Sequence, residues 1–162
     1  MNVYLVRHGA AVDLGEAGVK RDADRMLTPK GQKKTAAVAR ALKRMEALPE
    51  RIVSSPLVRA RETADILAEI LTPGKAVEEA DVLATDAGAK EAVAWLGKQP
   101  DSPVMLVGHM PGMATLASLL LSGGPSLRID FKKSAACCIS FDAKAQAGAG
   151  QLDWLMPPAM AE

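Results

Sequence analysis

The chain has 162 residues and a formal net charge of +1; apolar residues make up 49% of it and aromatic residues 3%. This length suits one domain with a single core, which must be built from aliphatic side chains. The sequence contains neither an apolar run of the roughly 18 residues that span a membrane nor a signal-peptide pattern. We therefore expect a cytoplasmic protein with one domain over residues 1–156 and a frayed tail over 157–162.

Charge is distributed unevenly along the chain. Residues 1–61 hold 13 Lys and Arg against 6 Asp and Glu, a net charge of +7, whereas residues 62–162 hold 7 against 13, a net charge of −6. The basic part favours an anionic ligand. Nucleic acid is a poor candidate, because few aromatic residues are available for stacking and no dense Lys/Arg tract occurs. A small phosphate group fits better.

Apolar periodicity and turn residues predict alternating strands and helices. The predicted strands cover residues 2–7, 51–54, 75–82, 103–108, 127–131, 135–141 and 151–155. The predicted helices cover residues 29–48, 56–71, 87–98 and 111–121. Thr28 and Pro29 supply the N-cap and the first position of the first helix, and a glycine-containing loop over residues 9–27 precedes it.

This alternation predicts an α/β fold, a three-layer α/β/α sandwich with a mostly parallel sheet and antiparallel strands near the C-terminus. The crossovers place the carboxyl ends of the parallel strands along one edge, where ligands bind in such sheets. The two histidines, His8 and His109, each follow an apolar strand of this kind. They are therefore predicted to meet in one pocket although they are far apart in the sequence.

Two arginines accompany these histidines at the predicted sheet edge. Arg7 precedes His8, and Arg59 lies in the first turn of the helix that Pro56 opens. Paired guanidinium groups and the helix start after His109 suit a tetrahedral dianion, and a neutral imidazole can attack phosphorus. We expect phosphoryl transfer with His8 as nucleophile, while Arg7, Arg59 and His109 stabilise the charge on the transferring group.

A metal site is a rival interpretation of two converging histidines. Zinc needs at least one further ligand, but no HxxxH, CxxC or clear carboxylate partner accompanies His8 and His109, and neighbouring arginines repel a cation. We therefore expect neither a metal nor a cofactor. Ser54 and Ser55 are not predicted to be nucleophiles, because no GxSxG elbow surrounds them and a capping role before Pro56 accounts for one of them.

The four motifs, in chain order, are RHG at residues 7–9, LTPKG at 27–31, SSPLVRARET at 54–63 and VGHMP at 107–111. Together they resemble the histidine phosphatase superfamily, which has a phosphoglycerate mutase-like fold. The short length and the absence of a large insertion resemble its SixA-like branch, the phosphohistidine phosphatases. The resemblance implies a phosphohistidine intermediate on His8, with Arg7, Arg59 and His109 completing the phosphate pocket.

Many larger members of this superfamily are similar to one another in one further feature. They carry a general-acid glutamate in an inserted segment before the strand that bears the second histidine. Here residues 72–103 leave little room for it. Four carboxylates in this stretch cannot be matched to the role: Glu78, Glu79, Asp81 and Asp86. Protonated phosphohistidine expels a neutral imidazole, whereas a phosphoester must expel an alkoxide. The missing acid therefore predicts a preference for P–N bonds, with Asp24 as a weak candidate for a substitute acid.

The partner expected from this chemistry is a phosphohistidine-bearing protein such as a histidine-phosphotransfer domain, which acts in signal transduction. Two other functions stay open: a phosphomonoesterase for a small metabolite or nucleotide, and a non-catalytic module that binds phosphoproteins. We expect no nucleic acid or membrane as partner, and we favour a monomer.

Overall fold

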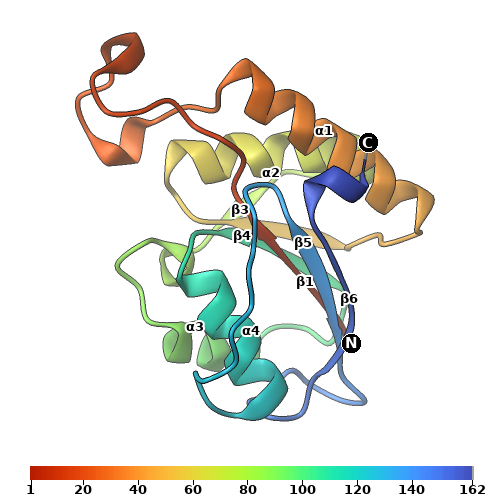
Figure 1. The fold of residues 1–162 in the computed structure, drawn as a ribbon. Helices are drawn as coiled ribbons and strands as arrows, with labels where there is room; N and C mark the ends of the chain where they lie inside the picture. The colour runs from red at the N-terminus through yellow and green to blue at the C-terminus, as the bar shows by residue number, and fades with distance from the viewer. Residues whose placement is uncertain (162) are drawn as a thin grey trace.

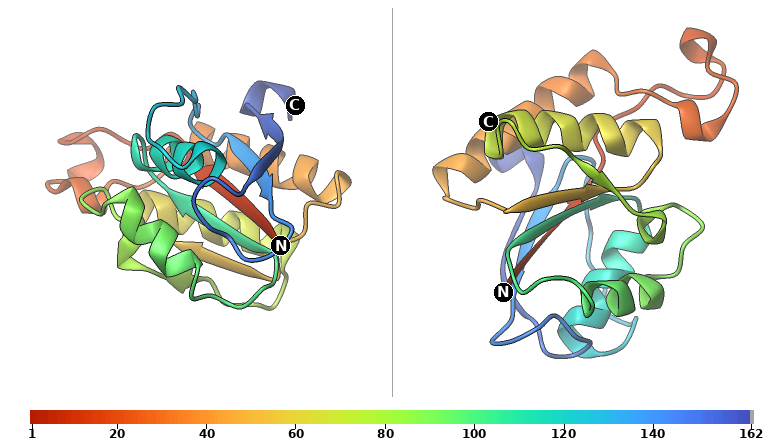
Figure 2. Two further views of the ribbon diagram at one scale, coloured as in Figure 1. Left: turned by 90° about the horizontal axis from the view of Figure 1, so that it is seen from below. Right: turned by 180° about the vertical axis from the view of Figure 1, so that it is seen from behind.

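The computed structural model describes residues 1–161. Its middle layer is a six-stranded sheet, with α1 and α2 on one face and α3 and α4 on the other (Figures 1 and 2). The strands are β1 (Asn2–Arg7), β2 (Arg51–Ser54), β3 (Glu78–Glu79), β4 (Val104–Gly108), β5 (Ala136–Ser140) and β6 (Gln151–Met156). The helices are α1 (Pro29–Arg44), α2 (Val58–Leu71), α3 (Ala89–Leu96) and α4 (Gly112–Ser122). The predicted three-layer α/β/α sandwich is confirmed.

The sheet has the strand order β3-β2-β4-β1-β5-β6. Strands β3, β2, β4 and β1 are parallel, whereas β5 is antiparallel to β1 and β6 is antiparallel to β5. The mixed sheet therefore has the predicted parallel part and the predicted antiparallel C-terminal strands. In the register of β1 and β4, Arg7 pairs with Gly108. The next residues, His8 and His109, therefore follow the ends of two adjacent strands at the same height along the sheet.

Alternating side chains of the central strands build two separate cores. Tyr4 and Val6 face α1 and α2, while Val3 and Leu5 face α3 and α4. Period-two alternation produces this division, because successive strand residues point to opposite faces. Full burial of a side chain such as Leu5 stabilises the fold by about 1.5–3 kcal/mol. The aliphatic cores on both faces therefore fix the position of β1.

Helix α1 begins as its sequence predicts. Thr28 is the N-cap, and its Oγ1 accepts a hydrogen bond from the backbone N–H of Gly31 at 3.0 Å. Pro29 occupies the first helical position, and Val38 and Leu42, one turn apart, are buried against the sheet. The N-terminus of α1 is consequently fixed close to the end of β1.

The segment 9–27 joins β1 to α1 and extends beyond the sheet at the carboxyl ends of its parallel strands (Figure 1). It contains two short 3₁₀ turns, Glu16–Gly18 and Asp22–Asp24. A bridge between Ala11 and Leu27 closes its base. The prediction of a loop here is confirmed, with these turns added.

Two predicted strands differ from the structure. Residues 127–131 do not form a strand; Ile129 and Phe131 pack against the core under α3 and α4 instead of joining the sheet. Phe131 is nevertheless buried, while Leu127 is exposed. The strand predicted over 75–82 is confined to Glu78–Glu79 at the sheet edge.

The expectation of a frayed C-terminus is wrong for the part of it that the structure describes. Residues Pro158–Met160 form a 3₁₀ turn beside α1 (Figure 1), and Pro158 and Ala161 are buried. Ala161 belongs to the core under α1 and α2. Within residues 1–161, none of the helices combines the length and hydropathy that a membrane crossing requires.

Candidate active site

The structure brings His8 and His109 together at the carboxyl ends of β1 and β4. Their ring centroids are 5.1 Å apart. His8 Nδ1 lies 2.7 Å from the carbonyl oxygen of Gly9, an acceptor that fixes the proton on Nδ1. The lone pair of neutral His8 is then on Nε2.

Arg59 reaches the same point from the first turn of α2. Its Nε lies 3.4 Å from His8 Nε2, and the side chain is 4% exposed. Its other nitrogens contact Asp22 in the 9–27 segment: Nη1 donates to the backbone oxygen at 2.9 Å and Nη2 to Oδ2 at 3.1 Å. A buried guanidinium thus links Nε2 of His8 to the 9–27 segment.

His109 is held by a residue that the sequence did not mark as functional. Its Nε2 lies 2.7 Å from the hydroxyl oxygen of Ser55, which also accepts a hydrogen bond from Leu57 N–H at 3.3 Å. The Ser55 hydroxyl donates to Nε2 when the proton of a neutral His109 is on Nδ1, and accepts from Nε2–H in the other tautomer. The predicted capping role of a serine is wrong, because Leu57 is the N-cap of α2 and no side chain of residues 1–161 caps the helix; Ser55 instead holds the turn before α2 and contacts His109.

Two buried polar atoms of this site lack hydrogen-bond partners among residues 1–161. They are Nε of Arg7 and Nδ1 of His109. Arg7 donates from Nη1 to the carbonyl oxygen of Phe131 at 2.8 Å, which leaves Nε unused. Buried polar atoms are normally satisfied, so each of these two atoms is available to a ligand.

Both histidines are neutral near pH 7 in this environment. Burial is the main cause that lowers the pKa of His8 to about 4; the hydrogen bond to Gly9 opposes this shift, and the charges of Arg59 and Arg7 add to it. Burial likewise lowers the pKa of His109 to about 3, with smaller contributions from His8 and Arg59. Each ring consequently keeps one lone pair at neutral pH.

Carboxylates near the site occupy fixed ion pairs. Hydrogen bonds from Arg25 and Arg59 keep the pKa of Asp22 below its ordinary value, so this carboxylate is ionised at neutral pH. Asp24, the weak candidate for an acid, instead pairs with Arg21 at 2.7 Å on the exposed side of the loop. Residues 1–161 contain no group of three or more His, Cys, Asp or Glu side chains placed to hold a metal.

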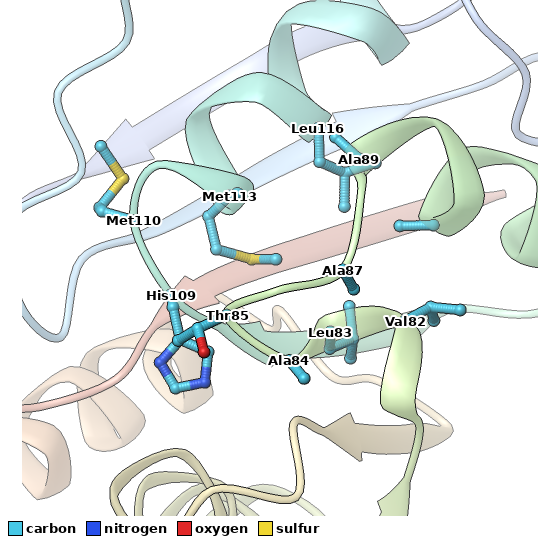
Figure 3. A pocket seen from close by; sticks show the side chains of 12 residues that line it. Val82, Leu83, Ala84, Thr85, Ala87, Ala89, His109, Met110, Met113 and Leu116 are labelled. Carbon is cyan, nitrogen blue, oxygen red and sulfur yellow. The ribbon is translucent and has the colours of Figure 1, made fainter. Parts of the chain in front are cut away.

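The wall beside His109 is nearly apolar. A small pocket there is lined by the segment from Val82 to Ala89 and by the start of α4. Figure 3 shows hydrocarbon and sulfur side chains around His109, with the hydroxyl of Thr85. Asp81 and Asp86 are exposed and are not part of this lining.

Side chains of α2 also position the turn after β1. Thr63, one helical turn beyond Arg59, accepts from Gly9 N–H at 3.0 Å and donates to Arg59 O at 2.7 Å. Glu62 accepts from Leu27 N–H at 2.6 Å and so holds the end of the loop. Glu62 and Thr63 follow Arg59 by three and four residues, which places them beside Arg59 on the surface of a helix. This spacing was a sequence signal that these two residues lie near the site.

The fold and this paired-histidine site define a known class. Residues 3–84 match the model of the histidine phosphatase superfamily (branch 1), and the chain belongs to this superfamily. It is 37% identical over 138 residues to an uncharacterised protein of Picosynechococcus, covering 83% of this chain and 81% of that protein.

Within the superfamily the chain is a phosphatase of the SixA-like branch. It is 28% identical over 163 residues to the phosphohistidine phosphatase SixA of Escherichia coli, covering 98% of this chain and 94% of that one. A structure of the protein histidine phosphatase SixA with tungstate superposes with a TM-score of 0.87 at 25% identity, with full coverage of both chains. A phosphoserine phosphatase of Entamoeba histolytica shares the fold at a TM-score of 0.70 and 17% identity, covering 98% of each chain.

Proposed function

We propose that the protein removes the phosphoryl group from phosphohistidine on another protein, through a covalent phosphohistidine on His8. The first step forms a bond between His8 Nε2 and phosphorus and breaks the substrate P–N bond. The substrate imidazole leaves neutral if its ring is protonated beforehand. Water then attacks the phosphorus on His8, which releases phosphate and restores the neutral nucleophile.

The observation that carries the proposal is the pair of unpartnered buried atoms, Arg7 Nε and His109 Nδ1, on a site that already holds Arg59 and His8. In the proposed roles, Arg7, Arg59 and His109 bind the three equatorial oxygens of the transferring group. His8 supplies the lone pair on Nε2, because Gly9 O holds its other proton. This arrangement suits in-line transfer between two imidazoles.

The substrate class is inferred from the absence of a positioned proton donor among residues 1–161. Asp22 is ionised and bound to Arg59, and the wall beside His109 offers no carboxylate. An alkoxide leaving group needs a proton that this site does not supply, whereas an imidazole that leaves in its neutral form needs no proton from the site. The names of the SixA relatives agree with this choice.

The experiment compares three substrates: a phosphorylated histidine-phosphotransfer domain, free phosphohistidine and phosphoserine. We expect the wild type to release phosphate from both P–N substrates much faster than from the ester. His8→Ala should lose P–N hydrolysis by several orders of magnitude, since no alternative nucleophile is present in the proposed mechanism. Phosphate trapped on the wild type as an acid-labile adduct should be absent from His8→Ala.

Asp24→Asn is the control, because this carboxylate pairs with Arg21 rather than with the site. Its P–N activity should stay within about twofold of the wild type, as for a surface substitution. Efficient hydrolysis of phosphoserine or a sugar phosphate with no action on phosphohistidine would instead favour a phosphomonoesterase, the function that the fold of the Entamoeba enzyme suggests. Binding of phosphoprotein without turnover would favour a non-catalytic module.

A further inference from the structure

Helix α1 has an unusual charge pattern. Its sixteen residues include six Lys or Arg and no acidic residue. Lys30, Lys33 and Lys34 lie in its first two turns, next to the positive end of the helix dipole, where acidic side chains are normally favoured. The lysines therefore oppose the local stability of the helix, and helix formation does not account for them.

These side chains border the active site. Lys30 and Lys34, one turn apart on the same helix face, line a hollow of about 650 Å³ together with Lys132, Lys133 and Arg7. Arg7 connects this hollow to the proposed phosphate pocket. The hollow thus lies between α1, the segment that leads into β5 and the C-terminal residues 157–159.

The start of α1 is held against the turn that carries His8. Thr28 N–H donates to Ala10 O at 2.9 Å, and a side chain at Gly31 would collide with the backbone of Ala10. Figure 1 shows the beginning of α1 following directly from the loop above the end of β1. A partner whose phosphohistidine reaches His8 therefore passes close to these lysines.

The basic surface extends further than a phosphoryl group. A second hollow continues along α1 from Lys30 to Arg40, about 15 Å along the helix axis. We call the whole set the lysine face: Lys30, Lys33, Lys34, Arg40, Lys132 and Lys133. Of these, Lys132 pairs with Asp130 at 2.7 Å, and the others have no ion pair with a side chain of residues 1–161. This surface is consequently complementary to a negatively charged group larger than the transferring one.

We propose that the lysine face binds an acidic surface surrounding the phosphohistidine of the partner protein and so presents that residue to His8. The inference rests on the proposed function and adds the surface chemistry of its substrate. A protein surface is favoured over an anionic membrane because the charges line hollows on two separate segments rather than a flat plane. Electrostatic complementarity of this kind raises the association rate and fixes orientation.

The test uses two double charge reversals of the full chain with the same change in net charge. Lys30→Glu with Lys34→Glu alters the lysine face next to Arg7. Lys43→Glu with Arg44→Glu alters the exposed far end of α1, which lines neither hollow. Substrates are a phosphorylated histidine-phosphotransfer domain with an acidic surface and free phosphohistidine.

We expect the Lys30/Lys34 variant to lose about tenfold or more in kcat/KM on the protein substrate, mainly through KM. The loss should be at least about fivefold greater than on free phosphohistidine, and added salt should narrow the difference from the wild type. The Lys43/Arg44 variant should lose at most about twofold on the protein substrate. The melting temperature of the Lys30/Lys34 variant should not fall, because glutamate suits the N-terminus of a helix.

Equal losses on both substrates would overturn the proposal, because the lysines would then act on the chemistry itself. Equal losses in the two double variants would overturn it in favour of overall charge. The Lys30/Lys34 variant could also keep wild-type kinetics on the protein substrate but no longer sediment with vesicles of anionic phospholipid. That result would assign the lysine face to a membrane and would overturn the proposal as well. If the wild type hydrolysed neither phosphohistidine substrate, the proposed function would fall, and the docking role with it.

Discussion

At the scale of single residues, the site depends on the proton positions of two imidazoles. A backbone carbonyl holds the proton of His8 on Nδ1, and a serine hydroxyl approaches Nε2 of His109. Burial lowers the pKa of both rings, so each is neutral near pH 7 and keeps one nitrogen lone pair. In the proposed mechanism, His8 supplies a lone pair for attack and His109 an N–H for binding.

Ser55→Ala is expected to lower kcat about tenfold, because His109 loses the partner that orients its ring. Ser55→Thr keeps a hydroxyl and should recover part of the activity. Ser54→Ala is the matched control: its hydroxyl is equally buried and donates to Ser55 O at 2.8 Å without contact to either histidine. Similar kcat values for the two alanine variants would show that Ser55 acts through packing alone.

The lowered pKa values also predict how stability depends on pH. Unfolded histidines titrate near 6.5, whereas the folded values are about 4 for His8 and about 3 for His109. Between these values the unfolded chain binds more protons, so the free energy of unfolding decreases as pH falls below 6.5. Each histidine contributes a slope of up to about 1.4 kcal/mol per pH unit.

Urea denaturation between about pH 7.5 and pH 5 measures this slope above the range where most carboxylates titrate. His109→Gln removes one of the two titrating groups and should roughly halve the decrease. A decrease of equal size in the wild type and in His109→Gln would show that other groups cause it.

The arginines and histidines of the candidate site could be predicted from the sequence, but the residues that hold them in place could not. Strand ends predicted Arg7, His8 and His109, because parallel strands deliver their carboxyl ends to one edge. The contacts of Ser55 to His109 and of Thr63 to Gly9 each join residues 54 positions apart. The first contact depends on the pairing of β2 with β4, and the second on how α2 packs against the turn after β1. Periodicity within one segment contains neither.

At the scale of elements, the site is a junction of β1, α1 and α2. The turn after β1 is bonded to both helices, through Thr28 from α1 and Thr63 from α2. In the same region Thr35 of α1 and Ser134 before β5 lie 3.0 Å apart by their hydroxyl oxygens. The position of α1 therefore determines the backbone next to His8.

Gly31→Ala tests this close contact. Alanine is the better helix former by about 1 kcal/mol, yet its Cβ would collide with the backbone of Ala10. We expect the collision to prevail, with a net loss of about 1–3 kcal/mol in stability and a lower kcat. Gly112→Ala in α4 is the control, because its Cβ would meet no atom within 4 Å, and it should not destabilise the protein. A gain in stability for Gly31→Ala would contradict the close approach.

Elements that depend on adjacent residues in the sequence were predicted well, whereas elements that depend on packing against distant parts of the chain were not. The cap at Thr28 and the apolar strand before His109 are readable from adjacent residues. Residues 127–131 alternate like a strand, but Ile129 and Phe131 pack against the core under α3 and α4, and no strand of the sheet pairs with them. The C-terminal turn has little pattern of its own and becomes ordered because Ala161 fits the core beneath α1.

At the scale of the whole molecule, the C-terminal turn closes the core on the α1 side. Deletion of residues 157–162 removes the buried side chains of Pro158 and Ala161. We expect a loss of about 1–3 kcal/mol in the free energy of unfolding, measured by urea denaturation. Met160→Ala is the control, since this side chain is 73% exposed and its loss should cost less than about 0.5 kcal/mol. A deletion variant as stable as the wild type would show that the turn is dispensable.

The two parts of the site differ in local stability, because the histidines follow central strands and the partner of Arg59 lies in a loop. His8 and His109 follow β1 and β4, each paired on both sides, so their backbone moves freely only when the domain unfolds. Asp22, the partner of Arg59, lies in a loop with largely exposed side chains and opens at much lower energy. Mild urea would therefore disturb the pairing of Arg59 before it separates the histidines, and substrate affinity would decline before the fold is lost.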